Sequence, residues 1–257
     1  MELELREYLW CLKLDFNIDA QLAAIRELLR QHHQAKTELS DRMSQIQQSA
    51  KQMTGVQSEQ AAEAWEDHAH HSVYQGAAHS MAAVGMLAPL IETIFFQCFR
   101  SIGNQFFPAS FPRSEHLRWK SAHSYQWDCH YVMKGEHREK NLAEGILQLA
   151  DAIGLASRLP NNLEKILSVL FGYRNEMFHN GLEWPVEVRQ RFGRRIAEAA
   201  WQQDWISQAT TGEEPWIFYL SDTYIEECLA MLNQVLDAIA GFVRDELLSR
   251  SGWLRDS

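Results

Sequence analysis

The segment 173–181 (YRNEMFHNG) holds an arginine and a histidine five positions apart. Arg174 can clamp phosphate oxygens through its planar fork of N–H donors. His179 can move a proton near neutral pH. Together these two side chains are the minimum that metal-free phosphodiester cleavage requires, so we take the segment as the first candidate site.

The spacing alone is a weak motif, because Arg118 and His123 repeat it elsewhere in the chain. Five helical residues turn about 500°, which leaves the two side chains about 140° apart. They converge only if the length of the arginine bridges the gap or if a partner molecule lies between them. Asn175 and His179 are four apart and share a helix face.

The context of Arg174 distinguishes it from Arg118. An apolar helical run, 166–171, precedes it, and Asn180-Gly181 provides a helix stop just after His179. With this context the segment resembles the HEPN superfamily (higher eukaryotes and prokaryotes nucleotide-binding domains), whose signature is arginine, a polar residue, about three further residues and histidine.

The resemblance covers residues 73–248 at the level of helix order. An upstream apolar stretch, 82–99, contains Leu-Ile-Glu at 90–92, and an apolar stretch at 225–243 closes the unit. At motif level only Arg174, Asn175 and His179 match. Residues 1–72 lie outside the resemblance.

The resemblance implies an all-α bundle of four or five core helices that forms a homodimer, with the two motifs facing each other across a cleft. Active members are metal-independent endoribonucleases of toxin–antitoxin, abortive-infection and RNA-guided defence systems. In such an enzyme His179 acts as general acid or base on the ribose 2′-hydroxyl or the leaving oxygen. Arg174 holds the scissile phosphate, and Asn175 orients either group. The resemblance implies no cofactor, and leaves room for an antitoxin or other regulatory protein partner.

A cluster of arginines follows the motif and predicts a local RNA-binding patch. Three tryptophans nearby either stack on bases or belong to the core. The arginines are Arg189, Arg191, Arg194 and Arg195; the tryptophans are Trp184, Trp201 and Trp205.

Histidines form two further patterns. The run 66–71 (EDHAHH) offers metal-ligand types, but only one pair of its histidines, His68 and His71, has helical i, i+3 or i+4 spacing, and one pair falls short of the three or four protein ligands of a metal site. We therefore predict a solvated segment and no metal site; a metal-dependent hydrolase is the most distant hypothesis. Four histidines recur every seven residues within an expected helix, 115–134, and its continuation: His116, His123, His130 and His137. This pattern predicts a half-buried polar face, with a groove lining or a titratable interface as the alternative.

A long helix is expected from Asp19 to about residue 52. Its apolar positions step by three and four, with polar breaks at His32 and Lys36. This stripe packs either on its own domain or in a dimeric coiled coil, where polar core positions set register. The stripe is formed by Leu22, Ile25, Leu29, His32, Lys36, Leu39, Met43, Ile46 and Ala50.

The remaining pattern predicts an all-α protein with an N-terminal arm and linker at 1–72 and a helical domain at 73–257. Segment 53–72 is a linker or a solvated helix. Further helices are expected at 73–102, 115–134, 139–157, 161–179, 185–208 and 223–249, the last opened by a capping box of Thr223 and Glu226.

Composition limits the function classes. The net charge of -10 argues against a broad electrostatic nucleic-acid binder. Four cysteines without a CxxC pair, and an acidic N-terminus, predict a cytoplasmic protein. The apolar run 86–99 is too short to span a membrane. Two hypotheses remain, a HEPN-type endoribonuclease and a non-catalytic helical dimerisation module.

Overall fold

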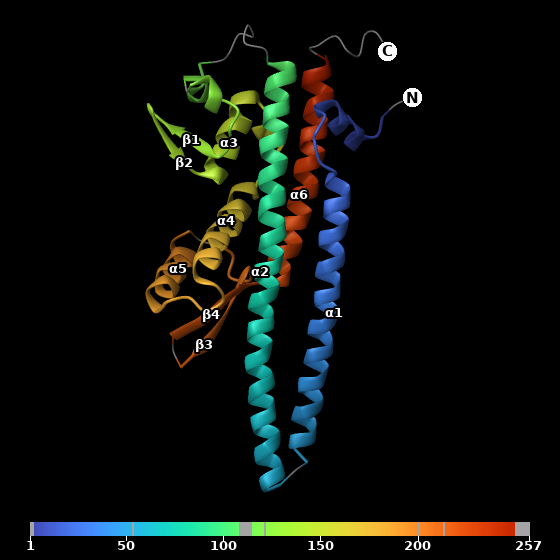
Figure 1. The fold of residues 1–257 in the computed structure, drawn as a ribbon, viewed down its shortest axis with the longest axis vertical. Coiled ribbons are helices and arrows are strands. Elements are labelled where there is room, and N and C mark those ends of the chain that lie inside the picture. The colour runs from blue at the N-terminus through green and yellow to red at the C-terminus, as the bar shows by residue number, and fades with distance from the viewer. Residues whose placement is uncertain are drawn as a thin grey trace. The chain divides into compact units, whose positions relative to one another are not determined.

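The structure, a computed structural model, describes residues 3–52, 54–107, 115–120, 122–199, 201–212 and 214–249 (Figure 1). Helices dominate the described residues, which confirms the all-α prediction. Helices α1 to α6 span Ile18–Ala50, Val56–Phe106, Leu142–Ile153, Leu163–Asn180, Val186–Glu198 and Asp222–Phe242. Two antiparallel strand pairs join β1 (Tyr131–Lys134) to β2 (His137–Lys140) and β3 (Ile206–Thr211) to β4 (Glu214–Leu220).

The chain forms two compact units, each built from discontinuous segments. Unit 1 comprises residues 1–18, 88–172 and 226–257, and unit 2 comprises residues 19–87 and 173–225. The predicted domain boundary at residue 72 falls inside α2. Both the Arg174 motif and the arginine cluster belong to unit 2.

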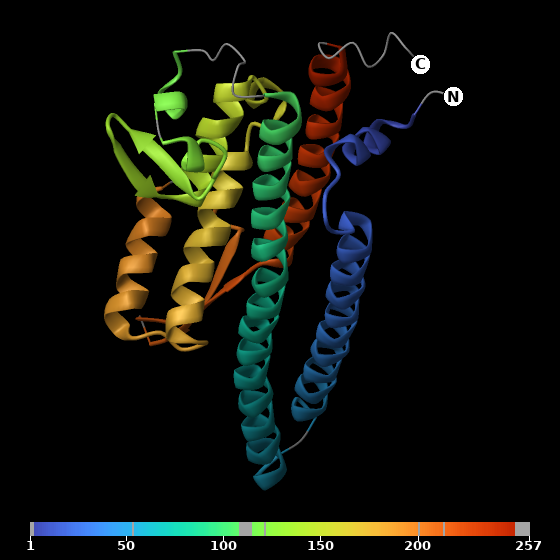
Figure 2. The same cartoon turned by 45° about the horizontal axis from the view of Figure 1, so that its top comes forward.

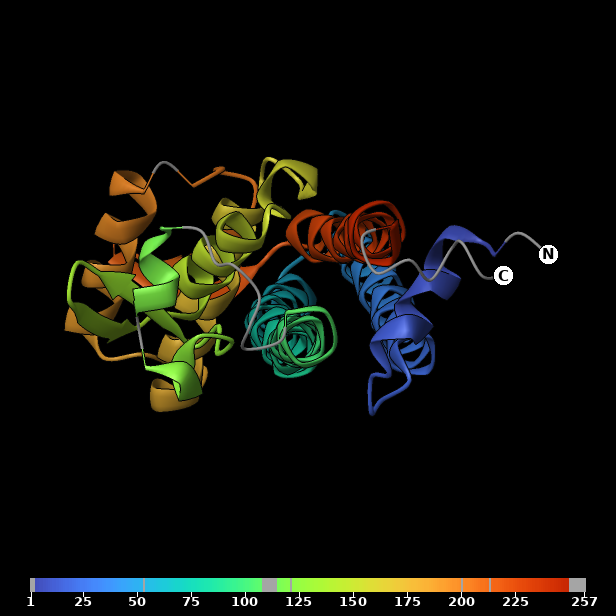
Figure 3. The ribbon, with the colours of Figure 1, turned by 90° about the horizontal axis from the view of Figure 1, so that it is seen from above.

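In unit 1, the C-terminal part of α2 and α6 lie side by side, as Figures 2 and 3 show. Their facing side chains are fully buried, among them Phe95, Phe99 and Val235. Helix α2 also contains the one stretch of the described residues that is long and apolar enough to cross a membrane by composition, but more than half of that stretch is buried in the protein. This burial is typical of a core helix in a soluble protein.

Arg118 of unit 1 is a structural residue. The residue is 1% exposed, and its guanidinium donates to four backbone carbonyls, those of Gln126, Tyr125, Asp128 and Tyr131. A guanidinium carries five donors in a fixed fork, so one side chain can hold an irregular loop together. Its equal spacing to His123 is therefore coincidental.

The predicted helix 115–134 is wrong. That region contains two 3₁₀ turns (Leu117–Lys120 and His123–Tyr125) and strand β1, which turns at Gly135 into β2. Gly135 has φ +64°, a conformation that favours glycine and that a two-residue hairpin turn requires. The four histidines spaced by seven therefore do not share a helix face.

One of these histidines is instead an ion-pairing residue within unit 1. His130 contacts Asp128 at 2.6 Å and Glu92 at 2.9 Å. Burial opposes the charged form, but the two carboxylates outweigh it and raise the pKa of His130.

In unit 2, α1 and the N-terminal part of α2 run antiparallel and side by side (Figures 1 and 2). The predicted stripe of α1 coincides with its least exposed positions, apart from Lys36, which is exposed. Leu22 and Ile25 are buried, and the later apolar positions are half-buried. The stripe thus faces α2 of its own chain, and the alternative of a dimeric coiled coil stays a prediction. Segment 56–72 is helical, as part of α2.

The three tryptophans near the arginine cluster are core residues. Trp184 and Trp201 are 4% and 5% exposed and pack around Phe192, while Trp205 is fully buried against Tyr224. Their indole faces are covered, so stacking on RNA bases is excluded for this conformation and the core interpretation holds.

The helix predicted at 139–157 is the shorter α3, Leu142–Ile153, and two other predicted helix boundaries also differ from the structure. Helix α5 ends at Glu198 rather than near residue 208, and the following chain forms β3. Helix α6 begins at Asp222, and the hydroxyl of Ser221 accepts a hydrogen bond from Tyr224 N at 3.1 Å. Ser221 is therefore the N-cap, and the capping box proposed for Thr223 does not form.

Candidate functional site

The Arg174 motif lies on the last turns of α4, in unit 2. Tyr173 and Met177 face inward, 2% and 1% exposed, and the Tyr173 hydroxyl donates to the carbonyl oxygen of Phe218 at 3.0 Å. The helix ends at Asn180, and Gly181 follows with φ +73°. This glycine confirms the predicted stop, because its left-handed conformation terminates a helix without strain.

The opposite face of the same turns carries the predicted catalytic residues. Asn175 and His179 are exposed, and Arg174 is partly exposed. The Arg174 guanidinium donates to the side-chain oxygen of Asn175 at 3.5 Å, so these two residues meet. Phe178, between them on this face, is 63% exposed. We call the surface of Arg174, Asn175, Phe178 and His179 the motif face.

Most of the arginine cluster is already engaged within unit 2. Arg191 contacts both carboxylate oxygens of Glu176 at 3.0 Å. Arg189 donates to the carbonyl of Pro215 at 2.6 Å, and Arg195 lies over the ring of Trp201. Arg194 is exposed. Their predicted role in RNA binding thus competes with structural contacts and stays a prediction.

The histidine run 66–71 lies on α2. His71 contacts the amide of Gln75, and His70 packs edge-on against Trp216. Within the described residues no group of three or more histidine, cysteine, aspartate or glutamate side chains is arranged to hold a metal ion. The four cysteines are free thiols.

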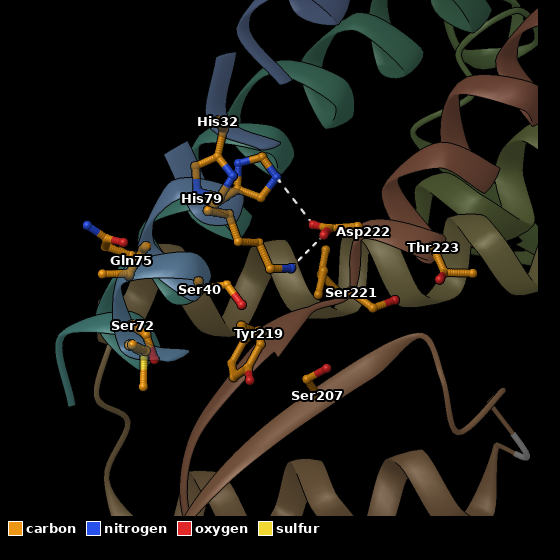
Figure 4. A pocket seen from close by; sticks show the side chains of 15 residues that line it. His32, Ser40, Ser72, Gln75, His79, Ser207, Tyr219, Ser221, Asp222 and Thr223 are labelled. Carbon is orange, nitrogen blue, oxygen red and sulfur yellow. Dashed lines mark hydrogen bonds and ion pairs between the residues drawn. The ribbon is translucent and has the colours of Figure 1, made fainter. Parts of the chain in front are cut away.

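A pocket of about 480 Å³ lies in unit 2 (Figure 4). Its walls come from α1, α2, strands β3 and β4, and the start of α6. Figure 4 shows the two imidazoles of His32 and His79 beside the carboxylate of Asp222. The hydroxyl residues that line it are Ser40, Ser72, Ser207, Tyr219, Ser221 and Thr223.

The imidazoles of His32 and His79 stack at 3.4 Å between ring centroids, with an angle of 12° between their planes. Burial lowers the pKa of His79 to about 4, and the neighbouring His32 adds to this effect. Burial also lowers the pKa of His32. Both rings are therefore neutral at pH 7. The lone pairs of the ring nitrogens lie in the planes of the two rings. Because these planes are nearly parallel, the lone pairs of the two histidines do not point at one metal ion.

Asp222 connects this stack to α1. Its Oδ2 accepts a 2.5 Å hydrogen bond from the ammonium of Lys36, and its Oδ1 lies 3.9 Å from His79 Nε2. Burial favours the neutral acid, but the Lys36 charge outweighs it and lowers the pKa of Asp222. The ion pair is thus formed at neutral pH.

Sequence reasoning missed this pocket, although one signal was present. His32 and Lys36 are the two polar breaks in the apolar stripe of α1, and both face the pocket. Their partners, His79 and Asp222, are remote in sequence, and only the fold brings the four residues together.

No protein-family model, no curated protein and no solved structure matches this chain.

Proposed function

We propose that this protein is a metal-independent endoribonuclease of HEPN type that acts as a homodimer. The observation that carries the proposal is the motif face: Arg174, Asn175 and His179 share an outward surface with the exposed Phe178. Phe178 is one of several exposed large apolar side chains of the described residues, and aromatic residues are enriched at protein interfaces.

A homodimer supplies what one helix lacks. On a single α4 the side chains of Arg174 and His179 point about 140° apart. Two copies of the motif face around a two-fold axis place the arginine of one chain opposite the histidine of the other. Phe178, at the middle of the face, then packs against its own symmetry mate and excludes water around the phosphate.

In this arrangement the roles follow from side-chain chemistry. His179 takes the proton from the ribose 2′-hydroxyl or gives one to the leaving oxygen. Arg174 neutralises the charge that develops on the scissile phosphate, and Asn175, in contact with Arg174, holds the guanidinium in orientation. Arg191, Arg194 and Arg195 are all exposed on α5, and Arg194, which takes no part in the contacts that engage the other two, is the best placed to contact the RNA backbone.

The experiment measures cleavage of a mixed cellular RNA in the presence of EDTA. Wild type should cut, whereas His179→Ala and Arg174→Ala should lose at least about 100-fold in rate, the lower range for a general acid–base group. His137→Ala, an exposed histidine on β2, is the matched control and should cut like wild type. Cleavage by both motif variants at the wild-type rate contradicts the proposal.

The dimer is tested separately by Phe178→Asp. This substitution should convert a dimer to a monomer in analytical ultracentrifugation and abolish cleavage, because each chain then has only half a site. A monomeric Phe178→Asp protein that retains full activity contradicts the shared site.

A non-catalytic helical module is the second candidate, favoured by the arm. Leu28 of α1 lies beside the apolar stripe and is 44% exposed. An exposed leucine on this long helix favours an arm that docks a second helix. In that case the dimer is lost in Leu28→Glu rather than in Phe178→Asp, and no RNA is cut. A cytoplasmic location and a regulatory protein partner also belong to the proposal.

A further inference from the structure

The pocket beside α1 is a built cavity rather than a surface dent. It measures about 480 Å³, within the range of small-molecule sites, and its lining comes from separate stretches of unit 2 (Figure 4). One side chain deep in its wall, His79, is only 9% exposed. The Nδ1 atom of His32 is buried without a hydrogen-bond partner in the described residues.

Charge balance in the pocket favours a neutral ligand. Lys36 and Asp222 form an ion pair, and both imidazoles are uncharged at pH 7. An anion entering here faces the carboxylate of Asp222, and a cation faces the ammonium of Lys36. Each charged ligand has to break the existing pair before it gains a new one.

The polar groups that remain available suit hydroxyls. Asp222 Oδ2 is occupied by Lys36, while Oδ1 and His79 Nε2 face each other across 3.9 Å, too far for a direct hydrogen bond. A hydroxyl oxygen at about 2.8 Å from both atoms fits this gap, donating to the carboxylate and accepting from the ring. An adjacent hydroxyl then reaches the side-chain hydroxyls that surround Asp222.

The pocket also has apolar lining. The ring of Tyr219 lies against Gly76, where an added Cβ would stand 3.3 Å from the ring. Leu39 and Met43 of α1 line the pocket as well. A ring with polar edges and an apolar face therefore matches both kinds of lining.

We propose that this pocket binds a neutral ligand through the vicinal diol of a sugar ring, with Asp222 and His79 as the groups that read the diol. The ring belongs either to a free monosaccharide or to the ribose of a nucleoside. The pocket is assigned independently of the motif face, so the two proposals stand or fall separately.

Isothermal titration calorimetry of the full chain tests the proposal from the ligand side. The probes are ribose, glucose, galactose, adenosine and uridine at up to millimolar concentration, with 2′-deoxyadenosine and 2′-deoxyuridine as matched ligands that lack the diol. At least one diol ligand should bind, and removal of its 2′-hydroxyl should weaken binding at least about tenfold, because the Asp222 hydrogen bond involves a charge. If sugars and nucleosides both bind, the pocket recognises the sugar ring alone. If only nucleosides bind, the pocket recognises the base as well as the ribose.

The protein side uses Asp222→Asn, which keeps the size of the side chain and removes its charge. Affinity should fall about tenfold or more, whereas Ser44→Ala, on an exposed position of α1 outside the pocket, should bind as wild type. If Asp222→Asn unfolds, Ser207→Ala replaces it, with an expected weakening of about three- to tenfold. No binding by any diol ligand, or equal binding of the deoxy analogues, overturns the proposal. Neither result bears on RNA cleavage, which is measured without these ligands.

Discussion

Acidification should destabilise the protein through the stacked histidines, and His79 carries most of the effect. The folded protein holds the pKa of His79 at about 4, against an ordinary value of 6.5. As pH falls from 6.5 to 4, the unfolded chain takes up a proton on this ring while the folded chain does not. The free energy of unfolding therefore falls over this range and is regained as pH rises.

The magnitude follows from the two pKa values. Their difference corresponds to about 3 kcal/mol once pH lies below both, and to about 2 kcal/mol between pH 7 and pH 5. Solvent screening reduces this little, because His79 is 9% exposed. Protonation of His32, whose pKa is also lowered by burial, acts in the same direction. The groups facing His79 are His32, Asp222, Lys36 and His33.

The assay is urea unfolding at pH 7 and pH 5, followed by far-ultraviolet circular dichroism. His79→Gln keeps a neutral polar side chain and should lose about 2 kcal/mol less than wild type on acidification, whatever its stability at pH 7. His137→Gln removes an exposed histidine and should follow wild type. If His79→Gln loses as much stability as wild type between the two pH values, the reasoning about the buried stack is refuted.

Three substitutions test the packing in each unit by the same unfolding measurement. Arg118→Lys should cost about 1–3 kcal/mol, because an ammonium has three donors for four carbonyls; an unchanged urea midpoint contradicts this. Gly145→Ala should cost about 3 kcal/mol, since its new Cβ would stand 2.6 Å from the carbonyl oxygen of Tyr131, and wild-type stability shows that the backbone can yield. Ser80→Ala leaves the buried Leu220 N–H, now bonded at 2.8 Å, without its acceptor and should cost about 1–3 kcal/mol; a neutral effect disproves the role of this bond.

Helices with strong periodicity could be predicted from the sequence. The stripe of α1 was correct position by position, because a single apolar face is encoded locally by steps of three and four. The end of α4 at Asn180 was also predictable, since glycine marks a left-handed stop. Lys36 is the exception within the stripe, since it is exposed although its ammonium contacts Asp222.

The wrong predictions arose where the local sequence pattern is compatible with more than one secondary structure. Residues 131–140 have few apolar side chains. Their hairpin is determined by the turn at Gly135 and by the hydrogen bonds from Arg118 to backbone carbonyls. The Gly135-Glu136 pair between two short runs was the available signal for a two-residue turn. At the start of α6 three consecutive residues can act as N-cap, and the end of β4 at Leu220 selects Ser221.

The pocket lies beyond such reasoning for a different reason. A histidine on an apolar face has the same sequence signature whether it packs in a core, stacks on another histidine or contacts a ligand. Only the pairing of α1 with α2 and the return of the chain through β4 decide which neighbour it meets. The motif face differs, because its residues are adjacent in sequence and the helix that holds them is encoded locally.

The contact between Arg191 and Glu176 has a consequence for any polyanion that approaches α5. A protein releases the counterions condensed on RNA only where an uncompensated positive charge meets a phosphate, and the Arg191 charge is already compensated by a carboxylate. Arg191 would then add little to the counterions released on binding. The salt dependence of RNA binding would therefore count fewer charges than the four arginines of the cluster, as suits a chain whose net charge is -10.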